Sequence, residues 1–350
     1  MTQLTKRQRK NVDLILSKGK VKNQDVLVFF ASLNEPLSRE TATRELRELV
    51  SLSYLKMIGK GRGVFYVLTE SHPLLKPLDH EKYLSVDQDV RAPGSIYFDH
   101  AIVSKLTGLL NEEEVAALSK EGDGFKKRIA GLPPAIIQKE FERITIELSW
   151  KSSKIEGNTY SLIDTEILIK EHREASGHTK GEAVMILNHK KALDYIFNNK
   201  ETFKVFSMRG IEDVHRLLVA DLGVPHGFRS KAVGITGTNY RPLDNVHQII
   251  EAIEKAVGAI NTAMDPWNKA LSTLLMISYI QPFEDGNKRT SRLMANACLI
   301  AADLCPLSFR SVNVGDYQKA ILTFYELGNA SPMKRIFMEQ VDFAVSNYFL

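Results

Sequence analysis

The pattern of apolar and polar residues over the first 70 positions predicts three helices followed by a β-hairpin. Helical spacing covers residues 5–17, 23–30 and 38–52, and the last range repeats apolar residues at Leu46, Leu49, Val50 and Leu52. Over residues 54–68, two alternating stretches flank a Gly-Lys-Gly-Arg-Gly turn. A glycine-rich turn between alternating stretches is a strong hairpin signal.

The remainder of the chain reads as a linker followed by a helical domain. Residues 71–98 hold Pro73, Pro77 and the pair Pro93-Gly94 without a clear period. We therefore predict a first domain at 1–75, a linker at 76–98 and a second domain at 99–350. Helices are expected over 134–157, 161–170, 182–197, 211–220, 267–280, 314–326 and 332–349, with one more beginning near Lys288.

Composition places the chain among ordinary globular proteins and separates the two domains by charge. Hydrophobic residues make up 44% and charged residues 25% of the 350 positions. No stretch has the length of a membrane span, no signal peptide is visible, and the two cysteines indicate a reducing cytoplasm. Residues 1–70 carry thirteen Lys/Arg against seven Asp/Glu, whereas the remainder carries 33 against 35. A basic first domain suggests an anionic partner.

Three helices and a basic hairpin are the order of a winged helix-turn-helix. In that arrangement the third helix enters the major groove of DNA, and we expect it to present Arg39, Arg44 and Arg47. Lys60 and Arg62 at the tip of the hairpin would contact phosphate. The alternative is a small helical domain that binds a protein or only positions the second domain.

The stretch from Gln281 to Arg292 combines groups that suit a polyphosphate. Asp285 can hold a divalent cation, since such ions prefer hard oxygen ligands. Gly286 and Asn287 allow successive backbone N–H groups to form an anion-binding nest at the start of a helix. Arg289 and Arg292 are three residues apart and project from the same side of that helix, and the N–H of Lys288 adds to its N-terminus.

This stretch, Gln-Pro-Phe-Glu-Asp-Gly-Asn-Lys-Arg-Thr-Ser-Arg, resembles the signature His-Pro-Phe-x-Asp/Glu-Gly-Asn-Gly/Lys-Arg-x-x-Arg of the Fic family. The resemblance implies AMP transfer from ATP to a hydroxyl of a target protein, with Mg²⁺ held by Asp285. It also implies phosphate binding by Gly286, Asn287, Lys288, Arg289 and Arg292. Gln281 stands where the family has its catalytic histidine. An amide does not accept a proton near neutral pH, and loss of a general base costs roughly 10²- to 10⁴-fold in rate.

A second resemblance lies upstream, at Ser152-Ser-Lys-Ile-Glu156-Gly157. It is similar to the inhibitory motif Ser/Thr-x-x-x-Glu-Gly/Asn of Fic proteins, in which the glutamate pairs with the second arginine of the signature, here Arg292. A carboxylate–guanidinium pair of this kind is charge-assisted and would block the nucleotide. The alternative is that Glu156 only precedes the glycine that ends the helix at 134–157.

Residues 226–243 interrupt the helical pattern and resemble the Fic flap, a hairpin along which a target segment lies as an added strand. The residues that would face the target are Gly234, Thr236, Gly237, Thr238 and Tyr240. The alternative is a plain surface turn.

Together these patterns predict a mainly α protein: an all-helical Fic core with a small β-hairpin flap, preceded by an α+β winged helix-turn-helix domain. Three functions are weighed. The first is an autoinhibited adenylyltransferase, slowed by Gln281, that uses ATP and Mg²⁺ on an unidentified target protein. The second is a nucleotide-sensing, DNA-binding regulator with a silent Fic domain. The third, ranked lower, is a kinase of the Doc type, which shares Asn-Lys-Arg but lacks the second arginine. No membrane contact is expected, and a homodimer is left open.

Overall fold

The computed structural model describes residues 5–52, 54–69, 72–75 and 78–350. The chain divides into two compact units, Met1–Ser85 and Val86–Leu350. The division falls inside the range 76–98 that the sequence suggests as a linker. Within the described residues, no helix is long and apolar enough to cross a membrane.

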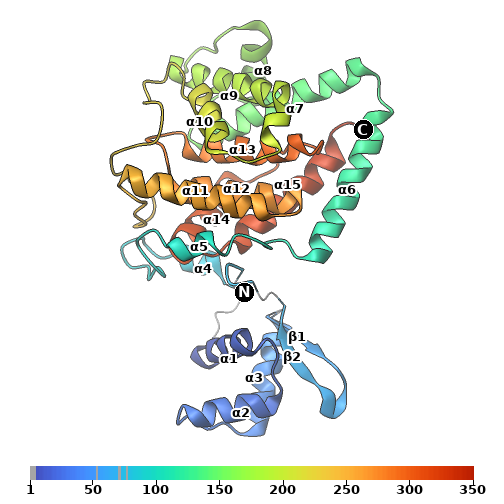
Figure 1. The fold of residues 1–350 in the computed structure, drawn as a ribbon, viewed down its shortest axis with the longest axis vertical. Helices are drawn as coiled ribbons and strands as arrows, with labels where there is room; N and C mark the ends of the chain where they lie inside the picture. The colour runs from blue at the N-terminus through green and yellow to red at the C-terminus, as the bar shows by residue number, and fades with distance from the viewer. Residues whose placement is uncertain (1–4, 53, 70–71, 76–77) are drawn as a thin grey trace. The chain divides into compact units, whose positions relative to one another are not determined.

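The first unit contains the three helices and the hairpin that the apolar pattern predicts (Figure 1). In chain order they are α1 (Lys6–Lys18), α2 (Asn23–Ser32), α3 (Arg39–Ser51), β1 (Leu55–Ile58) and β2 (Phe65–Leu68), followed by the short α4 (His80–Leu84). The strands are antiparallel, and Leu55 pairs with Leu68. A short 3₁₀ turn at Gly61–Gly63 joins them. The core of this unit forms where the apolar faces of the helices meet the hairpin, around Ile15, Val26, Phe30, Leu46 and Leu49.

The second unit is helical. Its α-helices are α5 (His100–Val103), α6 (Glu112–Ala130), α7 (Pro134–Ile155), α8 (Leu162–Glu171), α9 (Lys180–Asn198), α10 (Met208–Leu218), α11 (Val246–Thr262), α12 (Pro266–Ile280), α13 (Asn287–Ala301), α14 (Val314–Leu327) and α15 (Ser331–Asn347). The mainly helical fold class predicted from the sequence is confirmed.

Helices α12 and α13 form the centre of the second unit and pack against each other (Figure 1). From Trp267 to Ile280 nearly every side chain of α12 is buried, and α13 is buried along almost its whole length. A helix that is buried on all sides has no polar face to turn towards water. The loop between these two helices, residues 281–286, is therefore supported by two buried helices.

Two long helices, α6 and α11, are absent from the sequence-based prediction. In α11 the buried residues Ile249, Ile253, Ala256 and Ile260 do carry the helical period, so its signal is present in the chain. In α6 the pattern is blurred by two glycines. One of them, Gly122, is required by packing, because a Cβ there would lie 2.6 Å from Leu304 Cδ2 and 3.1 Å from a ring carbon of Trp267.

The segment 226–243 takes a different form from the predicted flap hairpin. Among its described residues no strand ladder forms. A turn lies at residues 236–237, and a single isolated bridge joins Arg241 to Tyr97. The backbone groups of this segment bond to other parts of the fold instead: Arg229 N donates to Pro282 O, and Gly237 O accepts from the Arg91 side chain. These bonds take the place of the cross-strand hydrogen bonds that a hairpin would form.

Candidate functional site

Gln281 ends α12 with its side chain turned into the protein. Its backbone is left-handed, with φ 52° and ψ 58°. The amide nitrogen Nε2 donates to Ser278 O at 2.6 Å and to the Tyr325 hydroxyl at 3.1 Å. The side chain is buried, with 6% of the residue exposed. An amide held in this way orders the loop but offers no titratable group.

The loop is closed by a reciprocal pair of hydrogen bonds between Phe283 and Asn287. Phe283 N donates to Asn287 Oδ1, and Asn287 Nδ2 donates to Phe283 O, both at 2.8 Å. The Phe283 ring stacks on His215 with ring centroids 3.5 Å apart. His215 Nε2 lies 3.0 Å from Asp285 O, and since a carbonyl can only accept, Nε2 carries the hydrogen. Burial lowers the pKa of His215 to about 4, so the ring is neutral.

Gly286 immediately precedes α13 and is a position where the backbone accepts no other residue without strain. Its φ is 82°, and a Cβ there would lie 3.1 Å from Val219 Cγ1. No side chain caps the start of α13. The first N–H groups of a helix have no partner within the helix, and together with the helix dipole they favour an anion. The sequence-predicted nest residues therefore lie together at an uncapped helix N-terminus.

Asp285 and Arg289 form an ion pair at the edge of this site. Arg289 Nη2 lies 2.8 Å from Asp285 Oδ2, but the arginine side chain is 2% exposed and the aspartate side chain 66% exposed. Burial lowers the pKa of Arg289, and the neighbouring Asp285 acts against that shift. Among the described residues, Nη1 of Arg289 is buried without a hydrogen-bond partner. A buried donor of this kind is unusual in folded proteins and suits the binding of a ligand.

Arg292 is fully buried and is contacted by the end of α7. Its Nη2 donates to Glu156 Oε1 at 2.8 Å and to Ser152 O at 3.0 Å, and its Nε donates to Ser152 Oγ at 2.9 Å. The guanidinium also lies over the Tyr317 ring, 5.3 Å from its centroid. Burial opposes the charge of Arg292, but Tyr317 and Glu156 together raise its pKa above the usual value. Its Nη1, like that of Arg289, has no partner among the described residues.

Glu156 directly follows α7, where the chain turns at Gly157. The glycine has φ 96°, a conformation in which other residues are strained. The Glu156 side chain is 19% exposed and faces two cations: Arg292, and Lys288, whose Nζ lies 3.7 Å from Oε2. The structure thus brings together the predicted motif Ser152–Glu156–Gly157 and the second arginine of the 281–292 stretch.

His189 is a contributor that the sequence analysis missed. Its Nδ1 lies 2.9 Å from Met185 O, and its Nε2 lies 2.8 Å from Ser152 Oγ. Because the carbonyl only accepts, Nδ1 carries the hydrogen and Nε2 accepts from the serine hydroxyl. Burial lowers the pKa of His189 to about 3. A continuous run of hydrogen bonds therefore connects α9, through Ser152, to Arg292. No spacing in the sequence marks this histidine, which lies 37 positions from Ser152.

Arg229 is a second contributor without a sequence signal, and it attaches the 226–243 segment to the loop. Its Nε donates to Gln281 O at 2.7 Å, and its backbone N donates to Pro282 O at 3.0 Å. Further along, Arg91 forms a buried ion pair with Glu326 and donates through Nη2 to Gly237 O at 2.5 Å. The segment is held at both its start and its turn.

Three of the five predicted target-facing residues line a groove. The groove has a volume of about 770 Å³, and its lining includes Gly234, Thr238 and Tyr240 of this segment together with Tyr97 and Phe98. Thr236 is exposed, Gly237 is partly buried, and Tyr240 is buried with its hydroxyl donating to Tyr279 O at 2.8 Å. Tyr240 is therefore largely buried, and it also lines the groove.

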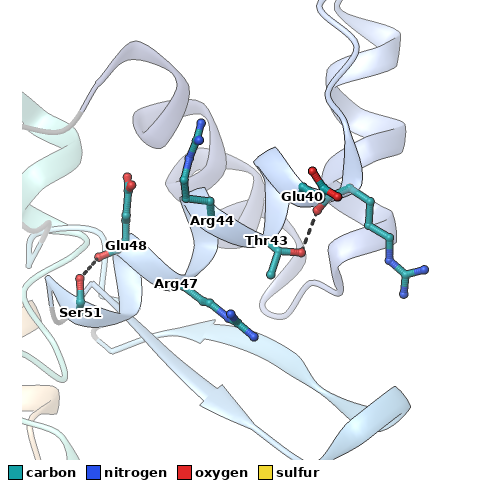
Figure 2. Close-up of a pocket in the computed structure, with 7 residues that line it drawn as sticks. Glu40, Thr43, Arg44, Arg47, Glu48 and Ser51 are labelled. Carbon is teal, nitrogen blue, oxygen red and sulfur yellow. Dashed lines mark hydrogen bonds between the residues drawn. The ribbon is translucent and has the colours of Figure 1, made fainter.

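The predicted DNA-facing arginines lie on the exposed side of α3. Arg39, Arg44 and Arg47 are exposed and line a depression of about 760 Å³ together with Glu40, Thr43, Glu48 and Ser51 (Figure 2). Within the part of the chain that the structure describes, these three guanidinium groups form no hydrogen bond or ion pair. Lys60 is exposed at the hairpin turn, whereas the Arg62 side chain lies outside the described ones.

Comparison with known proteins bears on the second unit. Residues 205–299, which include the loop 281–286, match the profile of the Fic/DOC family. A protein adenylyltransferase Fic of Nematostella vectensis is 26% identical over 220 residues, which are 59% of this chain and 49% of that protein. One from Drosophila ananassae is 27% identical over 156 residues, 44% of this chain and 31% of that protein. These matches show that part of the chain, including residues 205–299, is similar to Fic/DOC proteins. The chain spans half or less of the length of these relatives.

Solved Fic structures share the fold of about two thirds of this chain. Fic-1 from C. elegans superposes with a TM-score of 0.54 at 19% identity, covering 66% of this chain and 69% of that one. A Fic-domain signalling protein from Bacteroides thetaiotaomicron gives 0.53 at 16% identity, covering 66% and 95%. At these low sequence identities, the comparison supports only a shared fold.

Proposed function

We propose that the second unit is a Fic-type protein adenylyltransferase held in an autoinhibited state. The observation that carries the proposal is the contact of Glu156 with a fully buried Arg292 beside an uncapped helix N-terminus. The buried, unpartnered donors of Arg289 and Arg292 support a phosphate ligand. The relatives named protein adenylyltransferase Fic support the type of reaction.

In this proposal the chain binds ATP through the residues of the 281–292 stretch. The N–H groups at the start of α13 would cradle phosphate oxygens, and Arg289 and Arg292 would hold the outer phosphates. A bound Mg²⁺ would neutralise phosphate charge, and the exposed carboxylate of Asp285 fits it, since Mg²⁺ takes one or two carboxylates together with substrate phosphates. Among the described residues no group of three or more acidic, histidine or cysteine side chains could hold a metal without the nucleotide.

The reaction joins the hydroxyl oxygen of a target side chain to the α-phosphorus of ATP. The bond from that phosphorus to the oxygen bridging to the β-phosphate breaks, and pyrophosphate leaves with the bonding pair. The hydroxyl proton needs an acceptor, which the Gln281 amide cannot be. We therefore expect transfer at about 10²- to 10⁴-fold below the rate with a general base. Arg292 favours this reaction over the kinase reaction of Doc-type relatives, which lack the second arginine.

Intact mass spectrometry after incubation with ATP and Mg²⁺ tests the proposal. In Glu156→Gly the block on Arg292 is removed, and we expect a small fraction of chains heavier by one adenylyl group. In Glu156→Gly/Gln281→His the base is restored as well, and the fraction should rise by at least tenfold. The matched control is Gln281→His alone, in which Glu156 still covers Arg292. No adenylyl addition in the double variant, to the chain itself or to proteins of a lysate, would overturn the adenylyltransferase.

We further propose that the first unit is a winged helix that binds DNA, a function favoured by the three exposed and unpaired arginines of α3. Phosphate contacts from arginine and lysine dominate the affinity of such units for DNA. If Glu156→Gly/Gln281→His transfers no AMP but still binds ATP, we expect nucleotide binding to act by changing the affinity of the first unit for DNA. The chain would then be a nucleotide-sensing regulator.

A further inference from the structure

The two oxygens of the Glu156 carboxylate are held by two different cations. Arg292 Nη2 lies 2.8 Å from Oε1, and Lys288 Nζ lies 3.7 Å from Oε2. The Lys288 side chain is 28% exposed and that of Glu156 is 19% exposed, so solvent screens this contact only in part. The second contact comes from a residue that is also one of the first three of α13.

The positions of the two cations on α13 allow them to share one anion. Lys288 and Arg292 are four residues apart and therefore project from the same face of the helix. Both lie near its N-terminal half, where the helix dipole adds further positive potential. Arg289, on the next position, brings a third positive charge that Asp285 balances. With no nucleotide bound, Glu156 is the anion that balances the remaining pair.

A lysine suits a contact that must change partners. Its ammonium group is a compact charge with three donors on a flexible stem, whereas the Arg292 guanidinium is buried and fixed by Ser152. A nucleoside triphosphate would bring several negative charges to the same helix N-terminus. The ammonium of Lys288 can then leave Glu156 and contact a phosphate oxygen instead.

We propose that Lys288 is a positioning residue that holds Glu156 over Arg292 in the closed site and binds a nucleotide phosphate once Glu156 has left. The inference rests on the proposed nucleotide site and adds a regulatory contact to it. Its consequence is thermodynamic: Lys288 stabilises both the closed form and the nucleotide-bound form. Its removal therefore changes ATP affinity by an amount that depends on whether the Glu156 carboxylate is present.

Isothermal titration calorimetry with ATP and Mg²⁺ on four forms of this chain, each with both units, measures this dependence. They are the wild type, Lys288→Met, Glu156→Gln and the double variant. In the Glu156→Gln background the lysine has only phosphate to bind, and we expect Lys288→Met to weaken ATP binding about tenfold. In the wild-type background, weakening of the closed form offsets weakening of the nucleotide-bound form, and the change should be about threefold or less.

Hydrogen exchange of the nucleotide-free protein tests the closed contact separately. Lys288→Met should speed exchange over residues 152–158, because only Arg292 then holds the Glu156 carboxylate. The matched control is Lys154→Met, which removes a nearby positive charge whose Nζ lies over the Trp150 ring, 5.2 Å from its centroid. Exchange in that variant should match the wild type.

The outcomes distinguish this inference from the proposed function beneath it. Equal weakening of ATP binding in both backgrounds, or none in either, overturns the role of Lys288 while leaving the nucleotide site intact. Unchanged exchange over 152–158 in Lys288→Met does the same. Absence of ATP binding in the wild type and in Glu156→Gln alike overturns the nucleotide site, and with it both proposals.

Discussion

Ser152 holds the Arg292 guanidinium with both its hydroxyl and its backbone carbonyl, at 2.9 Å and 3.0 Å. The hydroxyl in turn donates to His189. Ser152 therefore has a structural role of its own, in addition to being the first residue of the motif that contains Glu156. These two bonds hold the guanidinium whose Nη2 also donates to Glu156 Oε1.

Ser152→Ala is expected to destabilise the second unit. The substitution leaves Arg292 Nε buried without an acceptor, and an unsatisfied buried donor costs about 1–3 kcal/mol. Urea unfolding followed by tryptophan fluorescence measures the change, because Trp150 and Trp267 both lie in this unit. The control is Ser104→Ala, whose hydroxyl is exposed and bonds only to the nearby Ala101 carbonyl. Equal stability of the two variants would contradict the role of Ser152.

The buried pair of Arg91 and Glu326 offers a second prediction. Their side chains are 7% and 3% exposed. Removing one partner takes a close counter-charge from the other buried side chain, so Arg91→Met should cost about 3–5 kcal/mol of unfolding free energy. In Arg91→Met/Glu326→Met both charges of this pair are absent, and most of that stability should be recovered. A double variant as unstable as the single one would mean that the cost comes from poorer packing and from the missing bond to Gly237.

DNA binding by the first unit predicts a defined dependence on salt. For duplex DNA, the slope of log affinity against log salt is about 0.9 for each phosphate that the protein neutralises. Arg44→Ala and Arg47→Ala should each weaken binding to duplex DNA and reduce the slope by roughly one, as measured by fluorescence anisotropy from low to moderate salt. Lys10→Ala is the control, since Lys10 is paired with Glu35. A drop as large in the control would place the binding surface elsewhere.

Two buried histidines predict a decline of stability in acid. Burial lowers the pKa of His189 to about 3 and that of His215 to about 4, whereas unfolded histidine titrates near 6.5. The unfolded chain therefore takes up protons first as pH falls. The stabilisation is fully present above pH ~6.5 and declines as pH falls from there towards the folded values, by up to about 1.4 kcal/mol per pH unit for each histidine.

Urea unfolding at pH 7, 6 and 5 measures this decline. His189→Gln should reduce the decrease in unfolding free energy between pH 7 and pH 5. The exposed His247→Gln should leave it as in the wild type. A pH dependence in His189→Gln as steep as in the wild type would show that this imidazole is not kept neutral by the fold.

The sequence predicts those parts of the site that follow from local order. The 281–292 stretch folds as a loop and a helix N-terminus because its glycine, asparagine and acidic residues favour that geometry by themselves. The contact between Glu156 and Arg292 is predicted only by the resemblance of residues 152–157 to the inhibitory motif of Fic proteins. The spacing of residues along the chain does not predict it. The contacts made by His189 and Arg229 depend on the packing of segments that are far apart in the sequence. No local sequence pattern predicts them.

The direction of the Gln281 side chain is another feature beyond sequence reasoning. Its partner Tyr325 lies 44 positions away on α14, and only the packing of α12 against α14 brings them together. The 226–243 segment shows the same limit. Its glycines and Thr-Asn pair suit a hairpin and an open turn equally well, and long-range bonds from Arg91 and Pro282 decide between them.

The left-handed backbone at Gln281 has an evolutionary consequence. Histidine is several-fold enriched in this region relative to most other residues, so it should fit this backbone at least as well as glutamine does. Their codons differ only in the third base. A single-nucleotide change could therefore exchange an inert amide for an imidazole at the end of α12 without disturbing the backbone. Lineages of this protein could lose or regain a proton acceptor at this position within one mutational step.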